Sequence, residues 1–238
     1  MKSKFFAVCT ILLLAASLAF AAQAKDDRGP LEKIVFIHYK NGHVKQAGGG
    51  AKAPVCYGFL ANGAKWKATP SYVINPANNY NLSQSFVASA VFAGAEEWDA
   101  ASSKELFGNN YSIDYSADAG TGAYNGRNEI SWGYYADANV IAVTTVWGYF
   151  GGAPKTRQLV EFDLLFDNDF AWGDGAADAS KMDLQNIATH ELGHAVGLGD
   201  LYNSCTEETM YGYSQEGETK KRTLGTGDVA GIRKLYGA

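Results

Sequence analysis

The sequence has few of the residues from which disulfide scaffolds and histidine-rich sites are made. Its 238 residues include three cysteines, four histidines and five prolines. Three cysteines are too few to hold together a small disulfide-rich fold, so the chain must bury a hydrophobic core. Acidic residues outnumber basic ones, and the net charge of −5 excludes the basic surface that nucleic-acid binding requires. With 47% hydrophobic and only 19% charged residues, the composition is not that of a disordered chain.

Long hydrophobic runs are also scarce, and the clear one lies at the N-terminus. Lys2 and Lys4 precede an apolar run that begins at Phe5 and is followed by small residues. This order predicts a secretory signal peptide over residues 1–24 and an extracellular location. The alternative is an uncleaved anchor, but the run is shorter than the roughly 20 residues that span a bilayer. We therefore expect no membrane association after the signal is removed.

Residues 25–51 form a short segment between this signal and the main domain. They hold five basic and three acidic side chains, and Gly48-Gly49-Gly50 near their end is typical of a flexible joint. Two interpretations stay open. The segment is either a short pro-segment removed on activation, or it supplies an extra strand over residues 34–39 to the mature protein. Residues 52–238 are predicted to form one domain.

Hydrophobic periodicity along this domain predicts helices and strands in a mixed order. A helix over residues 81–100 begins at a capping box of Asn81 and Gln84, and one over 181–196 begins at a capping box of Ser180 and Asp183. The mixture indicates an α+β fold with most strands in a single sheet. The other expected elements are a helix over 228–236 and strands over 71–75, 111–115, 129–133, 140–146 and 159–166.

The chemistry of the sequence is concentrated in the second of these helices, in the run His190-Glu191-Leu192-Gly193-His194. Residues four apart lie on one face of a helix, so His190 and His194 can present ring nitrogens to one cation. Glu191 is adjacent and can reach a water molecule at that ion without binding the metal. The arrangement is typical of zinc hydrolases, whose ligands leave one coordination position open. The alternative is a pair of ordinary surface histidines.

The third ligand follows partly by elimination. None of the four histidines comes after His194. Gly197 can adopt a left-handed conformation, end the helix and turn the chain back, which lets Asp200 reach the ion. Glu207 and Glu208 do not follow the glycine turn directly, so Asp200 is preferred as the ligand. The alternative is that Asp200 caps a local turn.

The run from His190 to Asp200 resembles the extended zinc motif of the metzincins, H-E-x-x-H-x-x-G-x-x-H, with aspartate in the third place as in snapalysin-like enzymes. Thr209-Met210-Tyr211-Gly212 resembles the Met-turn beneath the metal, and residues 228–237 resemble the closing helix of matrixins. The resemblance covers about residues 54–237. It implies a matrixin-like catalytic domain with a twisted, mostly parallel sheet, an antiparallel edge strand, an active-site helix, a Met-turn around Met210 and a C-terminal helix.

Cys56 and Cys205 remain after signal removal, in a compartment where disulfides persist. One interpretation is a disulfide between them, which would tie the start of the domain to the loop before the Met-turn. The run Pro54-Val55-Cys56-Tyr57-Gly58 also loosely resembles a cysteine switch, in which a thiolate caps the metal. Two free thiols are the third alternative.

These observations predict a secreted endopeptidase with one catalytic Zn²⁺, in which Glu191 acts as general base. We expect a monomer that binds a peptide or protein substrate in extended form along an edge strand, for which residues 139–144 are the candidate. The main alternative is a secreted binding protein that keeps the fold without cleaving, against which the intact Glu191 argues. A zinc hydrolase with a non-peptide substrate is a third.

A group of acidic residues precedes the helix that carries the two histidines. Such a group can bind Ca²⁺ through its carboxylate oxygens. The alternative is a solvated acidic turn. The residues are Asp163, Asp167, Asp169 and Asp174.

Overall fold

A computed structural model describes residues 28–41 and 55–238 of the chain. The expected signal peptide and the triglycine joint lie outside these residues. Within them the helices are α1 (Gln84–Ala101), α2 (Leu184–Ala195) and α3 (Thr226–Tyr236). The strands are β1 (Glu32–Lys40), β2 (Gly58–Phe59), β3 (Tyr72–Ile74), β4 (Tyr111–Ile113), β5 (Glu129–Gly133), β6 (Val140–Tyr149), β7 (Gln158–Asp167), β8 (Trp172–Gly173), β9 (Met182–Asp183), β10 (Leu198–Gly199) and β11 (Tyr213–Ser214).

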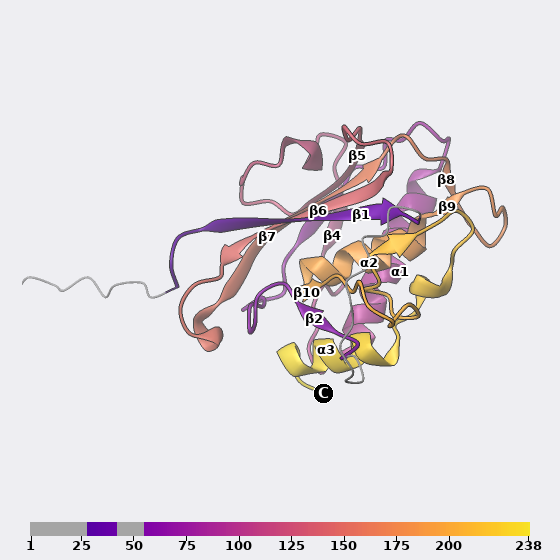
Figure 1. Cartoon of the computed structure of the whole chain (residues 1–238). Coiled ribbons are helices and arrows are strands. Elements are labelled where there is room, and N and C mark those ends of the chain that lie inside the picture. Colours follow the sequence, from indigo (N-terminus) through magenta and orange to yellow (C-terminus); the bar gives the residue numbers. More distant parts are fainter. Residues whose placement is uncertain (1–27, 42–54) are drawn as a thin grey trace, which may run out of the picture.

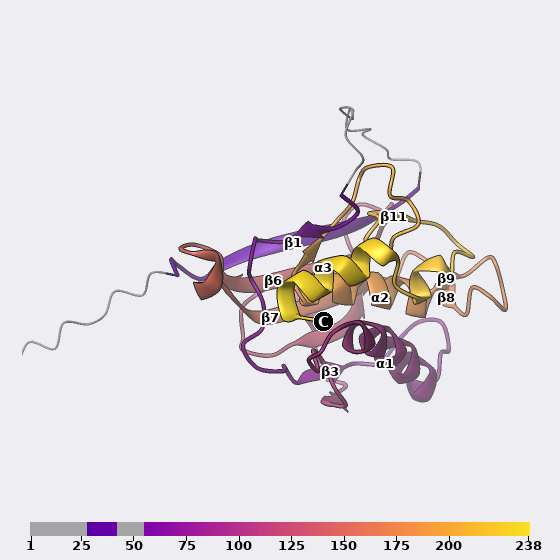
Figure 2. The same cartoon turned by 90° about the horizontal axis from the view of Figure 1, so that it is seen from below.

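A twisted sheet in the order β11-β1-β6-β7-β5-β3-β4 forms the centre of the molecule. Neighbouring strands among β4, β3, β5 and β7 run parallel, whereas β6 is antiparallel to β7. All three helices lie on one side of the sheet (Figures 1 and 2). The predicted α+β class is therefore confirmed, with a mostly parallel sheet and an antiparallel strand, β6, at one end of the group β3–β7.

Strand β1 continues the sheet beyond β6. It pairs antiparallel with β6 from Glu32, opposite Gly148, to Tyr39, opposite Val140, and it pairs in parallel with β11 on its other side. Figure 1 shows it as the long indigo arrow that crosses above α2. The sequence leads us to expect an open edge for substrate along residues 139–144. That edge is instead occupied by a segment of the same chain.

Helix α1 starts later than its sequence predicts. Asn81 has a positive φ of 58° and is not the cap, because the Asn78 side chain accepts hydrogen bonds from the backbone of Tyr80 and Leu82 and holds that turn. Ser83 is the N-cap and accepts from the backbone N–H of Phe86 at 3.1 Å. The helix then buries its apolar face against α2 and the sheet.

The capping box predicted for the second helix is also wrong in detail. Asp183 is the N-cap rather than the third helical residue, and it accepts from the N–H of Asn186 at 2.8 Å. Ser180 hydrogen-bonds to Asp178 in the preceding turn. Arg222 forms an ion pair with Asp183 and so ties the helix start to the segment before α3. Helix α2 is thereby fixed at its N-terminus by a buried, charge-paired carboxylate.

Cys56 and Cys205 form a disulfide that joins two segments 149 residues apart. The sulfur atoms are bonded to one another, which supports the disulfide interpretation over a thiolate on a metal. Gly227 lies against the backbone of Cys56, where a Cβ would collide with the Cys56 carbonyl oxygen. The start of the domain is thus anchored both to the loop after α2 and to α3. No helix in the part of the chain that the structure describes is long and apolar enough to cross a bilayer.

Candidate metal centre

Helix α2 carries His190 and His194 into the interior of the domain, on the face directed toward β1. Both side chains are buried, and their rings lie 4.9 Å apart between centroids. His190 bonds through Nδ1 to the carbonyl oxygen of Thr209 at 2.7 Å, and His194 bonds through Nδ1 to that of Leu198 at 3.0 Å. A carbonyl can only accept, so each Nδ1 carries the hydrogen and each Nε2 keeps its lone pair. The helix spacing and these two carbonyls fix both rings as potential ligands.

Asp200 reaches the same point from the chain that returns after α2. Gly197 has φ of 102° and ends the helix, and β10 then pairs with β2. Asp200 Oδ1 lies 3.2 Å from His190 Nε2 and 3.4 Å from His194 Nε2. Tyr202, which the sequence analysis does not single out, donates to Asp200 Oδ2 at 3.0 Å.

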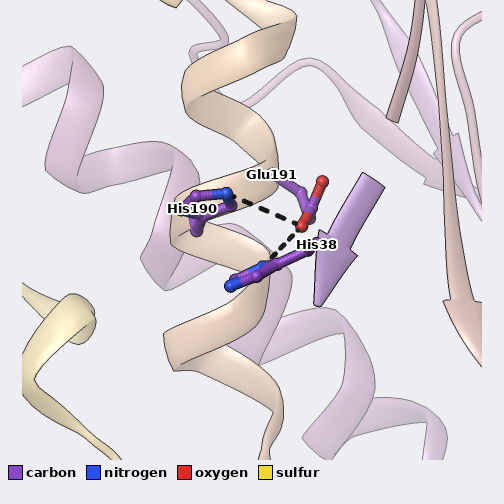
Figure 3. A group of neighbouring side chains, drawn as sticks. All are labelled: His38, His190 and Glu191. Atoms are coloured by element: carbon purple, nitrogen blue, oxygen red, sulfur yellow. Dashed lines mark hydrogen bonds and ion pairs between the residues drawn. The ribbon is translucent and has the colours of Figure 1, made fainter. Parts of the chain in front are cut away.

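Three potential ligand atoms therefore converge, and for two of them no hydrogen bond explains their burial. His190 Nε2 and Asp200 Oδ1 have no hydrogen-bond partner among residues 28–41 and 55–238. The ligand atoms of a second set, His38, His190 and Glu191, also lie within 4.8 Å of one another. In that set His38 and Glu191 bond to one another, as the dashed lines in Figure 3 show. The first set alone keeps its lone pairs directed at one another, so it is the better fit to a cation.

Glu191 lies beside these ligands and is held by two partners distant in sequence. Its Oε2 accepts from Thr144 Oγ1 at 2.6 Å, and its Oε1 lies 2.8 Å from His38 Nδ1. The carboxyl group is fully buried, and this burial raises its pKa to about 7. A carboxyl group with such a pKa is matched to proton transfer near neutral pH. The sequence motif places Glu191 but gives no sign of Thr144 or His38.

Met210 lies beneath α2. A Cβ at Gly193 would collide with the sulfur of Met210 and with the Trp98 ring, so glycine at this helix position lets the methionine approach the backbone. Asp228 of α3 accepts from the backbone N–H of Thr209 and Met210 at 2.6 Å and 3.2 Å. The turn that carries Met210 is therefore fixed by a buried carboxylate, and its neighbour Thr209 supplies the carbonyl that orients His190.

The four acidic residues considered as a calcium site do not converge. Asp163 accepts from the backbone of Glu129 on β5, Asp167 from that of Tyr135 and Asp169, and Asp174 pairs with Arg222. None of the four belongs to a metal-capable group within the described residues. The calcium alternative finds no support in their arrangement.

A sequence profile for matrixins matches residues 75–237, which is more than half of the chain. The chain belongs to the matrixin family. Matrilysin of Rattus norvegicus is 41% identical over 75 residues, which are 32% of this chain and 27% of matrilysin. Metalloendoproteinase 1 of Glycine max is 42% identical over 77 residues, which are 30% of this chain and 24% of that protein. The chain thus spans about a quarter of the length of these relatives.

Proposed function

We propose that this matrixin is a secreted zinc-dependent endopeptidase in which Glu191 is the general base. The observation that carries the proposal is the convergence of His190 Nε2, His194 Nε2 and Asp200 Oδ1, two of which are buried without a hydrogen-bond partner. Buried polar atoms are almost always paired, so lone pairs that face one another call for a cation. Two imidazoles and a carboxylate suit zinc and leave one position open.

The other residues of the site orient this set. The Thr209 and Leu198 carbonyls hold the two rings, and Tyr202 holds the second oxygen of Asp200. Zinc bound there would supply a Lewis acid that activates water and polarises a peptide carbonyl. Glu191 takes the proton of the attacking water and passes it to the leaving amine. Thr144 Oγ1 donates to Glu191 Oε2, which leaves Oε1 as the oxygen that receives the proton.

Strand β1 covers this machinery and supports the pro-segment interpretation of residues 25–51. Its Phe36 ring stacks on His194 at 3.8 Å between centroids, with 8° between the planes, and His38 lies 3.9 Å over His190. His38 also occupies Oε1 of Glu191, the oxygen that the reaction needs. We propose that β1 holds the intact chain in an inactive form and that its departure from α2 activates the enzyme.

The function is tested on the secreted full-length product and two variants. We expect one zinc per chain in the wild type, in Glu191→Gln and in the control Glu207→Gln, whose side chain is 83% exposed. After activation of the product, casein cleavage that a chelator blocks should occur in the wild type and Glu207→Gln only. Cleavage by Glu191→Gln would reject the assigned base. Zinc binding by all three without any cleavage would favour the non-catalytic binding protein.

A further inference from the structure

Strand β1 lies between β6 and β11 as an extended peptide substrate would. It is antiparallel to β6 on one side and parallel to β11 on the other, where Tyr39 pairs with Tyr213 and Lys40 with Ser214. Its side chains alternate, and those of Phe36 and His38 point down onto the rings of α2. Addition of a strand to a sheet edge is a general mode of peptide binding. The surroundings of each downward side chain therefore indicate which substrate side chain the site accepts at that position.

The side chain of His38 is held between two charged groups, and we call His190, Glu191 and Lys221 together the His38 site. Only 1% of His38 is exposed. Figure 3 shows its ring beside His190 and Glu191, where Nδ1 meets the carboxylate. On its other edge, Nε2 lies 3.2 Å from Lys221 Nζ. Since an ammonium can only donate, the neutral ring carries its hydrogen on Nδ1 and accepts at Nε2.

Lys221 is a fully buried cation whose ion pair with Glu218 is a long one, at 4.0 Å. It donates to the carbonyl oxygens of Tyr211 and Tyr213, which lead into β11, and its third hydrogen points at position 38. Glu218 Oε1 lies 4.0 Å from Lys221 Nζ and already accepts a hydrogen bond from Ser214 Oγ at 2.9 Å. Burial lowers the pKa of Lys221 to about 8. A buried ammonium that bonds directly to two neutral carbonyl oxygens, with one carboxylate 4.0 Å away, favours a closer partner of opposite charge at position 38.

We propose that Lys221 makes the His38 site select a glutamate side chain of the substrate, in the residue that takes the place of His38. The inference rests on the proposed peptidase function. A substrate must leave Glu191 free for water, so its side chain should accept from Lys221 without donating to Glu191. A carboxylate meets this condition and neutralises the ammonium. Glutamate has about the reach of the histidine ring, whereas aspartate is one methylene shorter and glutamine carries an amide N–H₂ that bonds to Glu191.

The position of the glutamate relative to the cleaved bond also follows from β1. Phe36 lies over His194 and His38 over His190, and His38 is the residue in contact with Glu191. The peptide bond that joins residues 37 and 38 is therefore the one between the two rings and next to the base. Cleavage should occur immediately before the selected glutamate.

The first test measures cleavage of peptides that differ only at this residue. With the secreted full-length product after its activation, we expect kcat/KM for glutamate to exceed that for glutamine or leucine by about tenfold or more. Lys221→Met should abolish this ratio, and Lys221→Arg should restore part of it. A lysine with only a structural role would scale all rates together. Equal rates for glutamate and leucine in the wild type, which needs no variant, would overturn the proposal.

The second test does not depend on activity. In the full chain with Glu191→Gln, which prevents self-cleavage, His38→Glu and His38→Gln are each combined with Lys221→Met. We expect Lys221→Met to lower the Tm of the His38→Glu chain by about 3 °C more than that of the His38→Gln chain. Equal losses would contradict selection by Lys221. If this coupling is present but no peptide is cleaved, the peptidase function fails and the assignment of the site stands.

Discussion

Replacing His38 by alanine should release activity from the intact chain. The side chain donates one hydrogen bond to a buried carboxylate and accepts one from a buried ammonium. A hydrogen bond to a charged group contributes about 1.5–3 kcal/mol, and the loss also leaves Lys221 with an unpaired hydrogen. We therefore expect β1 to be held more weakly by about 2–4 kcal/mol. At about 1.4 kcal/mol per tenfold change, the open fraction should rise by roughly 30- to 1000-fold.

The assay is the initial rate of peptide cleavage by freshly purified full-length protein whose intact N-terminus is verified by mass spectrometry. While the open fraction is small, the rate is proportional to it, so His38→Ala should start faster than the wild type. Val35→Ala is the matched control, because Val35 lies in the same strand on the opposite face and is 44% exposed. It should leave the initial rate near that of the wild type. An initial rate for His38→Ala no higher than that of the wild type would refute the inhibitory role of β1.

Two further predictions concern stability. Replacing both Cys56 and Cys205 by alanine should lower the free energy of unfolding by about 2–5 kcal/mol, because the bridge spans 149 residues. The measurement is urea unfolding, and a loss below about 1 kcal/mol would contradict the prediction. Burial, reinforced by Glu161, raises the pKa of Asp163 to about 8. Between about pH 4 and pH 8 the unfolded carboxyl loses its proton and the folded one keeps it, so the contribution of Asp163 to stability declines as pH rises, by up to about 1.4 kcal/mol per unit. Asp163→Asn should flatten this decline between pH 6 and 8, whereas the exposed control Asp169→Asn should keep the slope of the wild type. A decline in Asp163→Asn as steep as that in the wild type would show that Asp163 is not its source.

The parts of the site that could be predicted from the sequence are those fixed by local geometry. The spacing of His190 and His194 determines their common face on any helix, and Gly197 marks the turn that returns Asp200 to them. The structure brings these three residues together, while their role as metal ligands is a proposal. The disulfide was one of three alternatives in the sequence, because cysteine spacing alone cannot determine pairing.

The contacts that the sequence could not predict join residues distant in the chain. Thr144 lies 47 residues and His38 153 residues from Glu191, and nothing in their local sequence indicates this partner. Lys221 stands in the basic run Lys220-Lys221-Arg222, which gives no sign that its side chain is fully buried. Helix starts were misplaced for a related reason, since Asn78 and Arg222 act on the caps from outside the helical pattern. The sequence left two interpretations of the segment that forms β1 open, because the pattern of a strand does not reveal which edge of a sheet it joins.

The two charged groups of the His38 site explain how one position can hold both an inhibitor and a substrate. Neutral histidine offers one donor and one acceptor, so it satisfies Glu191 and Lys221 together and removes the base from reaction. A carboxylate offers only acceptors, so it can pair with Lys221 but must leave Glu191 to water. The difference between blocking and reacting thus lies in a single hydrogen directed at Glu191 Oε1. A peptide with histidine in this place should accordingly bind the activated enzyme and be cleaved slowly, as a competitive inhibitor of the glutamate peptide.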